Sequence, residues 1–300
     1  MAANMKAVKL RMKSIQSTMQ ITRAMELVAS SKLRKAKERA DASRPYFQIL
    51  HNTLTEIAAG NTDFVSPYTK EGSSTRWCYV VIAGDRGLAG GYNSNLFKLV
   101  QSEAEKNGAD YAVLPIGKKA VDHFRRRTTL VTEEFAEAAE ISVSDCFEIA
   151  KLLCKQYRSG EFGHIALCYT SFLSMLSQKP GISSLLPLSD FTKEEKDSES
   201  EHGEGTLQKE TKAAARSLIL YEPDSESVFN AIVPEYLAGL IYSAVCDSIA
   251  SELAARRTAM DAATKNAGEM IKQLELYYNR ARQAGITQEI TEIVAGAEEP

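Results

Sequence analysis

Proline is excluded from both ends of this chain, and that distribution constrains the fold more than any other feature of the sequence. None of the eight prolines lies in residues 1–44 or 235–299, whereas seven of them lie in residues 45–234. Proline removes a backbone donor and clashes inside a helix, so long stretches without it favour long helices. The two ends are therefore predicted to be long helices, and the middle to be a domain with turns.

The C-terminal segment carries an unbroken heptad pattern, which is typical of a coiled coil. Its positions step alternately by three and four residues: Met260, Ala263, Ala267, Met270, Leu274, Tyr277, Ala281 and Ala284. The alanines permit close helix approach but bury little area each. A helix of about 60 residues would be ~90 Å long at 1.5 Å per residue, which is far longer than a compact domain needs.

The N-terminal segment shows a helical stripe of its own. Val8, Met12, Ile15 and Met19 recur at spacings of four, three and four, and Ile21, Met25 and Val28 continue a neighbouring stripe. The Arg44-Pro45 step either ends this helix or bends it. Residues 1–44 carry eleven Lys or Arg against three acids, an asymmetry that indicates a specific interaction surface.

The middle of the chain alternates between strand-like and helical stretches. Short β-branched or aromatic runs at 77–83, 110–116, 164–172 and 217–223 are predicted strands, and 93–107, 117–127 and 143–158 are predicted helices. This alternation implies an α/β layer with a mostly parallel sheet. Residues 190–212 are polar and acidic, and we call them the acidic excursion.

The stretch GDRGLAGGYN, Gly84 to Asn93, follows the first predicted strand and raises the question of a nucleotide site. Its glycine spacing is Gly-x-x-Gly-x-x-Gly, which is neither the dinucleotide fingerprint nor a phosphate loop ending in Gly-Lys-Ser/Thr. We expect the glycines to supply positive φ angles and close packing at a strand-to-helix corner. Asn93 or Ser94 is expected to cap the helix that follows.

Other signs of chemistry are sparse in this sequence. The four histidines lack metal-ligand spacing, and no nucleophile motif is present, so we expect no catalytic residue, cofactor or metal site on this chain. Of the five cysteines, Cys78 and Cys168 are predicted core residues, and a reducing compartment is the expected setting. No apolar run approaches the ~20 residues of a membrane span. We expect no leader, because a charged, periodic pattern starts at once.

Three long motifs resemble the gamma subunit of F-type ATP synthases. They are QSTMQITRAMELVASSKLRKAKERADASRPY, GDRGLAGGYNSNLF and ARRTAMDAATKNAGEMIKQLELYYNRARQAGITQEITEIVAG. The resemblance implies a long antiparallel coiled coil of N- and C-terminal helices plus a central Rossmann-like α/β domain with a mostly parallel sheet. The expected ranges are 1–60 for the first helix, 75–222 for the α/β domain and 223–300 for the last helix.

The resemblance also implies a function and a set of partners. The coiled coil would be the rotating shaft inside the hexamer of alpha and beta subunits, while the α/β domain would help it meet the epsilon subunit and the membrane c-ring. The chain would be a non-catalytic subunit of a proton-translocating ATPase, although the coupling ion is a property of other subunits. It would lie peripherally on the cytoplasmic face of a bacterial inner membrane.

Seven residues are candidates for contacts with other subunits, and three of them match family positions directly. Met25 matches the shaft methionine that faces the moving catalytic lobes, or else it is one more apolar seam residue. Arg282 and Gln283 match a pair that hydrogen-bonds a loop of a catalytic subunit, with Thr287 and Glu289 as further candidates. Arg34 and Lys35 lie on the basic face and would meet an acidic segment of the same lobes.

Two alternatives follow from the residues alone. A basic coiled coil could bind nucleic acid, with steep salt dependence, although the basic run lacks interleaved aromatic residues. A doubly wound enzyme with oligomerising helices would bind a nucleotide, and the glycine spacing argues against it. Membership of the gamma-subunit family predicts instead that the chain copurifies with catalytic alpha and beta subunits.

Overall fold

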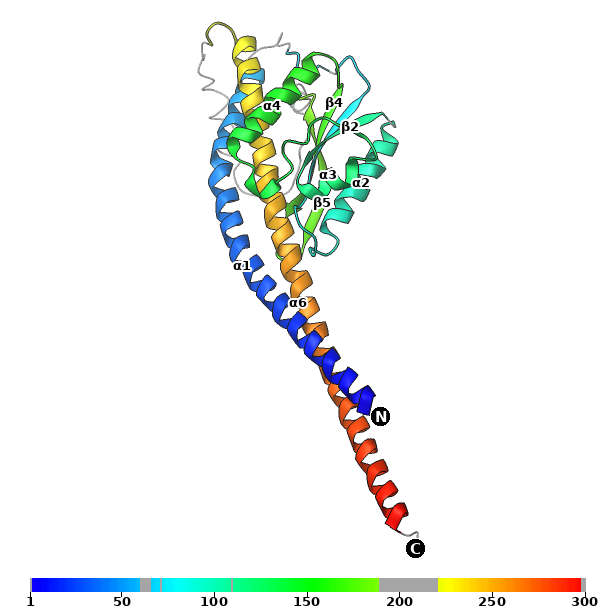
Figure 1. The fold of residues 1–300 in the computed structure, drawn as a ribbon. Coiled ribbons are helices and arrows are strands. Elements are labelled where there is room, and N and C mark those ends of the chain that lie inside the picture. Colours follow the sequence, from blue (N-terminus) through cyan, green and yellow to red (C-terminus); the bar gives the residue numbers. More distant parts are fainter. Residues whose placement is uncertain (1, 60–65, 71, 109, 189–220, 298–300) are drawn as a thin grey trace, which may run out of the picture.

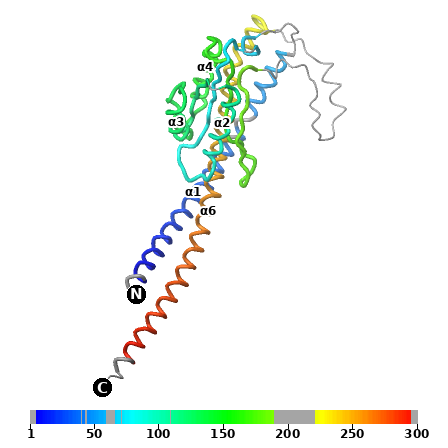
Figure 2. Tube along the Cα trace, turned by 90° about the vertical axis from the view of Figure 1, so that its right-hand side faces the viewer, coloured from blue at the N-terminus to red at the C-terminus, as the bar shows by residue number. Residues whose placement is uncertain are grey.

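The computed structural model describes residues 2–59, 66–70, 72–108, 110–188 and 221–297. Its longest elements are α1 (Ala2–Ala59) and α6 (Ser225–Ala297), which lie side by side as an antiparallel pair (Figure 1). An α/β domain packs against one half of this pair, and the other half extends away from the domain as a shaft (Figures 1 and 2). The predicted fold, a long antiparallel coiled coil with a central α/β domain, is confirmed.

A five-stranded sheet in the order β3-β2-β1-β4-β5 forms the centre of the α/β domain. Three pairs of neighbours are parallel, and only β4 and β5 pair antiparallel. The sheet is therefore mostly parallel, as predicted. The strands are β1 (Trp77–Ile82), β2 (Tyr111–Ile116), β3 (Thr129–Leu130), β4 (His164–Phe172) and β5 (Gln178–Leu186).

Sequence patterns located β1, β2 and β4 but missed the two edge strands. The strand β5 contains Pro180, Gly181 and two serines, a composition that normally indicates a loop. It is accommodated because β5 lies at the edge of the sheet, where proline and polar residues are tolerated. The run predicted as a strand at 217–223 falls mostly outside the described residues, and its described part, from Tyr221 on, is not in a strand.

Helices cover both faces of the sheet. Because successive strand residues point to opposite faces, Val80 and Ile82 of β1 join one hydrophobic cluster and Tyr79 and Val81 join the other. The first cluster contains residues of α4 (Val143–Arg158), α6 and the end of α1. The second contains residues of α2 (Tyr92–Lys106) and α3 (Lys118–Phe124). The long helices thus share a core with the sheet.

Both long helices run through a proline. Helix α1 continues past Pro45 to Ala59, so the Arg44-Pro45 step does not end it, and α6 contains Pro234. Packing sustains these turns, since Leu54 and Ile57 of α1 are fully buried in the core of the domain. Tertiary burial here outweighs the loss of about 3 kcal/mol that proline costs in an isolated helix interior.

The seam of α6 differs from the predicted heptad by one residue at alternate positions. Met260 and Ala267 are buried as predicted, but Ile271 is buried at 8% exposure while Met270 is 53% exposed and Tyr277 is 49% exposed. The heptad spacing correctly predicts one row of buried residues, through Met260 and Ala267. It does not determine on which side of that row the second buried row lies. Helix α1 selects the row through Thr264 and Ile271, because Thr22 contacts Thr264 directly.

The seam of α1 also needs a correction beyond Met19. The predicted stripe through Ile21 and Val28 faces outward, with exposures of 58% and 55%. The buried positions are instead Thr22, Ala29 and Leu33, which continue the spacing of Val8 to Met19. A polar and a small residue therefore take seam positions that hydrophobicity alone assigned to their neighbours, and large apolar side chains remain on the outside of the shaft.

The two helices end at different levels. Both views place the last turns of α6 beyond the N-terminal end of α1 (Figures 1 and 2). By length and composition, α6 is the one described helix that also passes for a membrane span, contrary to the expectation that no apolar run is long enough. Over half of that apolar stretch is buried inside the protein, at 56%, as expected for a core helix.

Candidate functional site

The glycine-rich stretch after β1 is a structural corner in the described structure. The carboxylate of Asp85 accepts hydrogen bonds from the backbone N–H groups of Lys118, Ala138 and Ala139, at 3.2, 2.9 and 3.1 Å. Gly90 has a φ of +57°, the left-handed conformation that glycine adopts readily. Asp85 therefore links three backbone segments beyond the carboxyl ends of β1 and β2.

The predicted helix cap after this stretch is wrong. Helix α2 begins at Tyr92, and no side chain caps it. The Asn93 side chain instead accepts a hydrogen bond from the backbone N–H of Gly84 at 2.9 Å, and the Ser94 hydroxyl donates to the Gly91 carbonyl at 3.1 Å. Asn93 thus closes the loop back onto the end of β1, a use that local sequence does not reveal.

The same loop is fastened to the shaft helix α6. The Tyr92 hydroxyl donates to the Ser248 carbonyl at 3.0 Å, and the Arg256 guanidinium donates to the carbonyls of Arg86 and Gly87 at 3.4 and 3.3 Å. Gly84 lets the Glu252 carboxylate approach closely, because a Cβ at this position would lie 2.5 Å from a carboxylate oxygen and would displace the side chain. We call this group of contacts the loop clasp.

A mostly buried ion pair supports the loop clasp. Glu252 and Arg256 are one helical turn apart, and their side chains are only 14% and 12% exposed. Desolvation raises the pKa of Glu252 above its usual range, while the charge of Arg256 and its hydrogen bond lower it. Burial is compensated by pairing and by the loop carbonyls, the arrangement that a buried charge requires.

No phosphate-binding arrangement surrounds this loop within the described residues. The hollow beside it, of about 300 Å³, is lined by the loop, β4, β5, α6 and the turn between the two strands. No lysine or arginine is among its lining residues, so a phosphate would have no cationic partner there. The described residues also contain no group of three or more His, Cys, Asp or Glu that could hold a metal ion.

The predicted residues of α1 lie where the helix leaves the α/β domain, since Leu33, next to Arg34, packs in a cluster that includes Phe172 of β4. Met25 is half-buried beside the α1–α6 seam, while Arg34 and Lys35 are exposed. Arg34 lies 3.8 Å from Glu38 in an ion pair whose side chains are 79% and 68% exposed. Such an exposed pair contributes little stability, so Arg34 remains available to another surface.

Part of the basic face packs against other elements of the same chain, namely α6 and β4. The Arg39 guanidinium donates to the Tyr242 hydroxyl at 2.6 Å and lies over its ring, and the Lys37 ammonium lies 4.7 Å from the centre of the Phe172 ring. Cation–π contacts of this kind stabilise packing between elements. Lys37 and Arg39 therefore have partners within the same chain, whereas Arg34 and Lys35 stay exposed and their contact with another subunit remains a prediction.

The predicted residues of α6 lie near its free end, far from those of α1. Arg282, Gln283, Thr287 and Glu289 are all exposed. The Thr287 hydroxyl donates to the Gln283 carbonyl at 2.9 Å, an interaction within one helical turn. Because positions seven residues apart share a helix face, Arg282 and Glu289 point the same way, and Gln283 and Thr287 share the adjoining face.

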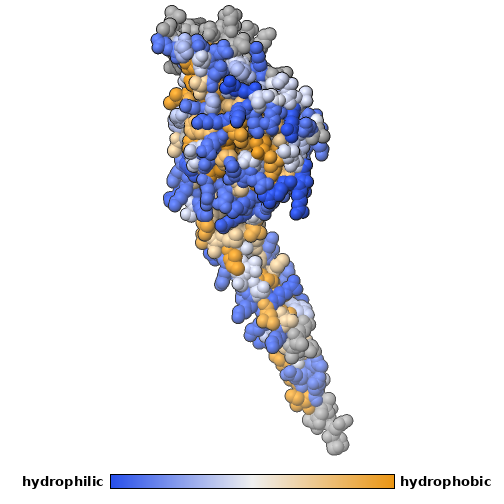
Figure 3. All heavy atoms as spheres, turned by 45° about the horizontal axis from the view of Figure 1, so that its top comes forward, coloured by the Kyte–Doolittle hydropathy of each residue, from blue (hydrophilic) through white to orange (hydrophobic). Residues whose placement is uncertain are grey.

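Sequence reasoning missed an apolar surface at the same end of α6. Four large side chains are exposed there, and no other described element covers them: Ile286 at 49%, Ile290 at 57%, Ile293 at 71% and Val294 at 53%. Hydrophobic patches also interrupt the polar surface along the shaft (Figure 3). Their spacing of four and three residues was the available signal, since an apolar stripe without a partner helix indicates an interaction site.

All five cysteines are buried free thiols, and Cys78 and Cys168 belong to the two faces of the sheet core as predicted. Burial raises the pKa of the Cys78 thiol to about 12 and that of Cys146 to about 12. Inaccessible thiols with raised pKa values are poor nucleophiles. These side chains therefore contribute packing and no chemistry.

Comparisons with known proteins agree over nearly the whole chain. A family model described as ATP synthase matches residues 4–299. The ATP synthase gamma chain of Ruminococcus albus is 44% identical, covering 97% of this chain and 96% of its own length. That of Lachnoclostridium phytofermentans is 41% identical, with 98% of each chain covered. A gamma chain of Acetobacterium woodii that is named sodium ion specific is 39% identical, with 99% of each chain covered.

Solved structures share the fold at lower identity. A rotor structure from the Euglena gracilis mitochondrial ATP synthase has a TM-score of 0.60 at 19% identity, covering 95% of this chain and all of the other. A second Euglena gracilis structure, of the OSCP/F1/c-ring assembly, has a TM-score of 0.65 at 19% identity, covering 99% and 94%. The relatives that match over nearly their whole length are ATP synthase gamma chains, which argues against the nucleic-acid-binding alternative. By its sequence, and in agreement with its fold, the chain belongs to the family of ATP synthase gamma chains.

Proposed function

We propose that this chain is the central rotor shaft of an F-type ATP synthase. Rotation driven by ion flow through a membrane ring would be coupled to ATP synthesis or hydrolysis on a surrounding hexamer of alpha and beta subunits. The observation that carries the proposal is the antiparallel pair α1 and α6, which extends well beyond the α/β domain in a chain of the gamma family (Figure 1).

The construction of the pair suits a narrow, stiff shaft. Small residues, including Ala29, Ala250, Ala254 and Ala267, occupy the buried seam and let the helices approach closely. Close packing resists bending because side chains in contact cannot be displaced without losing dispersion contacts. The exposed surface is polar with apolar patches, so it can slide past a surrounding ring without one deep contact holding it (Figure 3).

The loop clasp gives the shaft a rigid base. Torque applied to the α/β domain reaches α6 through the shared core and through Tyr92, Glu252 and Arg256. The core alone fixes distance and orientation by packing, and the directional hydrogen bonds to the loop oppose sliding along the helix axis. The glycine-rich motif thus joins the domain to the shaft in this proposal, and any nucleotide lies on other chains.

Two groups of shaft residues would meet the catalytic subunits. Met25, half-buried at mid-shaft, presents an apolar side chain to the moving lobes, and Arg34 and Lys35 attract acidic segments by screened electrostatics. Exposed charges attract over about 8 Å at physiological ionic strength, so this contact guides the surfaces without fixing them. A coupling free energy then links shaft angle to nucleotide affinity.

The second group lies at the free end of α6. Arg282 and Gln283 point about 100° apart on the helix, and both are exposed. Arginine presents a planar fork of donors, so this pair can hold one catalytic subunit in one rotor orientation and release it in the next. Thr287 and Glu289 continue the same two faces toward the apolar tip formed by Ile286, Ile290, Ile293 and Val294.

The remaining expectations belong to this same role. The partners would be the alpha, beta and epsilon subunits and the membrane c-ring, with this chain non-catalytic and peripheral on the cytoplasmic face of a bacterial inner membrane. The helical ranges 1–60 and 223–300 would form the shaft and the range 75–222 its base. A proton is the expected coupling ion, yet one relative is named sodium ion specific, and the gamma chain need not set the ion.

Copurification tests the proposal. A tagged copy of the chain expressed in its host should bring down two larger subunits in a ratio of three to three to one, together with ATPase activity. The chain alone, refolded without those subunits, should neither hydrolyse ATP nor bind it. Recovery of the tagged chain without catalytic subunits, or bound instead to nucleic acid, would contradict the proposed role.

A further inference from the structure

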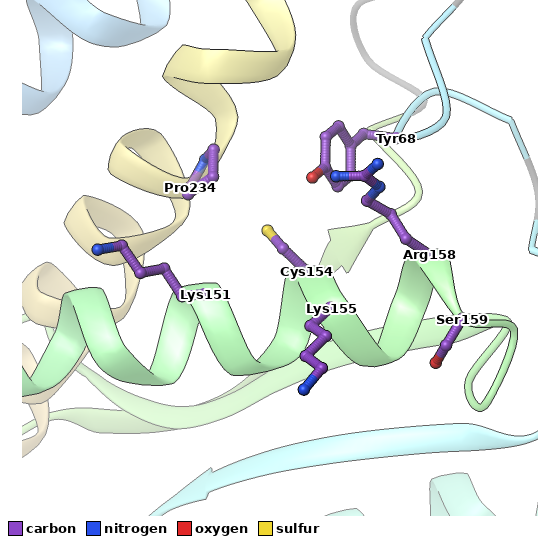
Figure 4. A pocket seen from close by; sticks show the side chains of 7 residues that line it. All are labelled: Tyr68, Lys151, Cys154, Lys155, Arg158, Ser159 and Pro234. Carbon is purple, nitrogen blue, oxygen red and sulfur yellow. The ribbon is translucent and has the colours of Figure 1, made fainter.

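A basic pocket lies at the far side of the α/β domain from the loop clasp. Its volume is about 440 Å³, and it is lined by Tyr68, Lys151, Cys154, Lys155, Arg158, Ser159 and Pro234. Figure 4 shows the Arg158 guanidinium against the Tyr68 ring, and Lys151 reaching toward the part of α6 that carries Pro234. Three cations therefore line one face of α4 at positions separated by four and three residues.

The charges of this pocket are not neutralised by the described part of the chain. No ion pair joins Lys151, Lys155 or Arg158 to an acidic side chain among the described residues, although surface lysines elsewhere in the α/β domain, such as Lys118 and Lys106, have acidic partners. Lys155 and Arg158 lie in the last turn of α4, where cations complement the helix dipole. Lys151 lies outside that turn, so the dipole does not account for the whole cluster.

Leu188, the last described residue before the acidic excursion, is held beside the same pocket. The backbone N–H of Leu188 donates to the carbonyl of Tyr68 at 2.8 Å, and Tyr68 lines the pocket. Asp190 and Glu194 follow Leu188 by two and six residues. An extended chain spans at most about 3.6 Å per residue, so these acids can reach ~7 and ~20 Å from Leu188, enough to cover the pocket.

We propose that the basic face of α4, formed by Lys151, Lys155 and Arg158, is the docking surface for the acidic excursion of the same chain. The charges are complementary, since residues 190–210 carry eight acids against three lysines. The short tether from Leu188 makes the association intramolecular, with an effective concentration in the millimolar range for a short linker. A contact between exposed charges of this kind is reversible and weakens as salt rises.

The proposal goes beyond the rotor role and does not depend on it. Docking concerns only two parts of one chain, whereas shaft function depends on α1 and the far end of α6. A failure of docking would therefore leave the rotor proposal intact, and a failure of the rotor proposal would leave the charge pairing to be measured on its own.

Zero-length crosslinking measures the contact directly. A carbodiimide joins a lysine amine to a carboxylate only where the two groups touch, and peptide mass spectrometry identifies the joined pair. In the full-length chain, isolated with whatever subunits copurify, we expect Lys151 and Lys155 to be joined to acids of residues 190–210. Lys98 on α2, which is exposed and has no ion-pair partner among the described residues, serves as the internal reference.

A charge reversal that keeps both lysines tests the cause. Arg158→Glu should lower the Lys151 and Lys155 crosslinks at least about fivefold and should speed trypsin cleavage after Lys193, Lys196 and Lys209 by a similar factor. Arg126→Glu is the matched control, because Arg126 is an exposed arginine at the end of α3 without a described ion pair. Circular dichroism of both variants checks that the helices are retained.

The outcomes separate clearly. Crosslinks from Lys151 and Lys155 that exceed those of Lys98, fall in 1 M salt and fall with Arg158→Glu support the docking. Crosslinks no more frequent than those of Lys98, crosslinks to an acid of another subunit, or equal trypsin cleavage rates in Arg158→Glu and Arg126→Glu would overturn it.

Discussion

Thr22 of α1 and Thr264 of α6 place their hydroxyl oxygens 2.7 Å apart, although 242 residues separate them in the sequence. Each hydroxyl also lies within hydrogen-bonding distance of a carbonyl of its own helix, that of Met19 at 3.0 Å and that of Met260 at 2.8 Å. A partly buried polar pair with satisfied hydrogen bonds favours one register of the two helices over its neighbours, because a shift would separate the two hydroxyls.

This register can be tested with a disulfide. Two cysteines in Thr22→Cys/Thr264→Cys should oxidise readily, because side chains in contact bring the Cβ atoms within the range a disulfide requires. Peptide mass mapping of the purified chain under nonreducing conditions detects the disulfide bond. Ile21→Cys/Thr264→Cys is the control, since Ile21 faces outward. Equal oxidation of both pairs would mean that the seam does not run through Thr22.

Met25→Lys should impair coupling while ATP hydrolysis is largely kept. The change places a long cation at mid-shaft, where a charge-assisted hydrogen bond to an acidic lobe can stabilise one rotor state over the others. Ion pumping per ATP hydrolysed, measured in vesicles that contain the complex, should fall severalfold. Met25→Leu keeps the apolar surface and should retain coupling. Unchanged pumping in the lysine variant would reduce Met25 to a seam residue.

Arg282→Ala/Gln283→Ala should lower turnover without preventing assembly. A hydrogen bond to a charged group contributes about 1.5–3 kcal/mol, so losing such contacts in one rotor state should slow steady-state hydrolysis roughly tenfold or more. Gln273→Ala/Arg280→Ala changes two exposed residues of the same helix and serves as the control. If both double variants hydrolyse ATP at the same rate, these side chains are simply solvated surface, where substitutions stay within about 0.5 kcal/mol.

Arg256→Ala should destabilise the domain through the loop clasp. It leaves the carboxylate of Glu252 buried without its partner and removes the donor to the Arg86 and Gly87 carbonyls, and breaking a buried pair costs roughly 3–5 kcal/mol. Thermal unfolding of the full-length chain should show a lowered midpoint. Arg257→Ala, one position along α6, should change it far less. Similar midpoints for both variants would show that the clasp carries little energy.

Sequence patterns predicted the architecture well because they read periodicity and proline placement. Two long helices and an intervening α/β domain follow from spacing and from where proline is excluded. The same patterns failed at the second row of each seam, where Thr22 takes the place predicted for Ile21 and Thr264 that predicted for Ala263. Which side of a helix is buried depends on the surface of its partner helix, and the spacing of apolar residues within one helix does not report that surface.

The site residues divide in a similar way. Met25, Arg282 and Gln283 are predictions from the resemblance, and the structure leaves Met25 half-buried and the other two exposed on the shaft. Composition alone assigned the whole basic run to a partner, yet Lys37 and Arg39 bind aromatic rings of the same chain. Asn93 was misassigned as a helix cap, because its partner, the backbone of Gly84, lies across a loop whose path no local rule specifies.

Direct observation of rotation tests the central claim. The catalytic subunits of the purified complex would be fixed to a surface, and a bead would be attached through a single cysteine introduced at the exposed Lys98 of the α/β domain, since the native cysteines are buried. On addition of ATP, the account predicts stepwise rotation of the bead in one direction, which stops when ATP is removed. Sustained ATP hydrolysis with the bead stationary, in complexes of intact composition, would contradict the assignment of this chain as the rotor shaft.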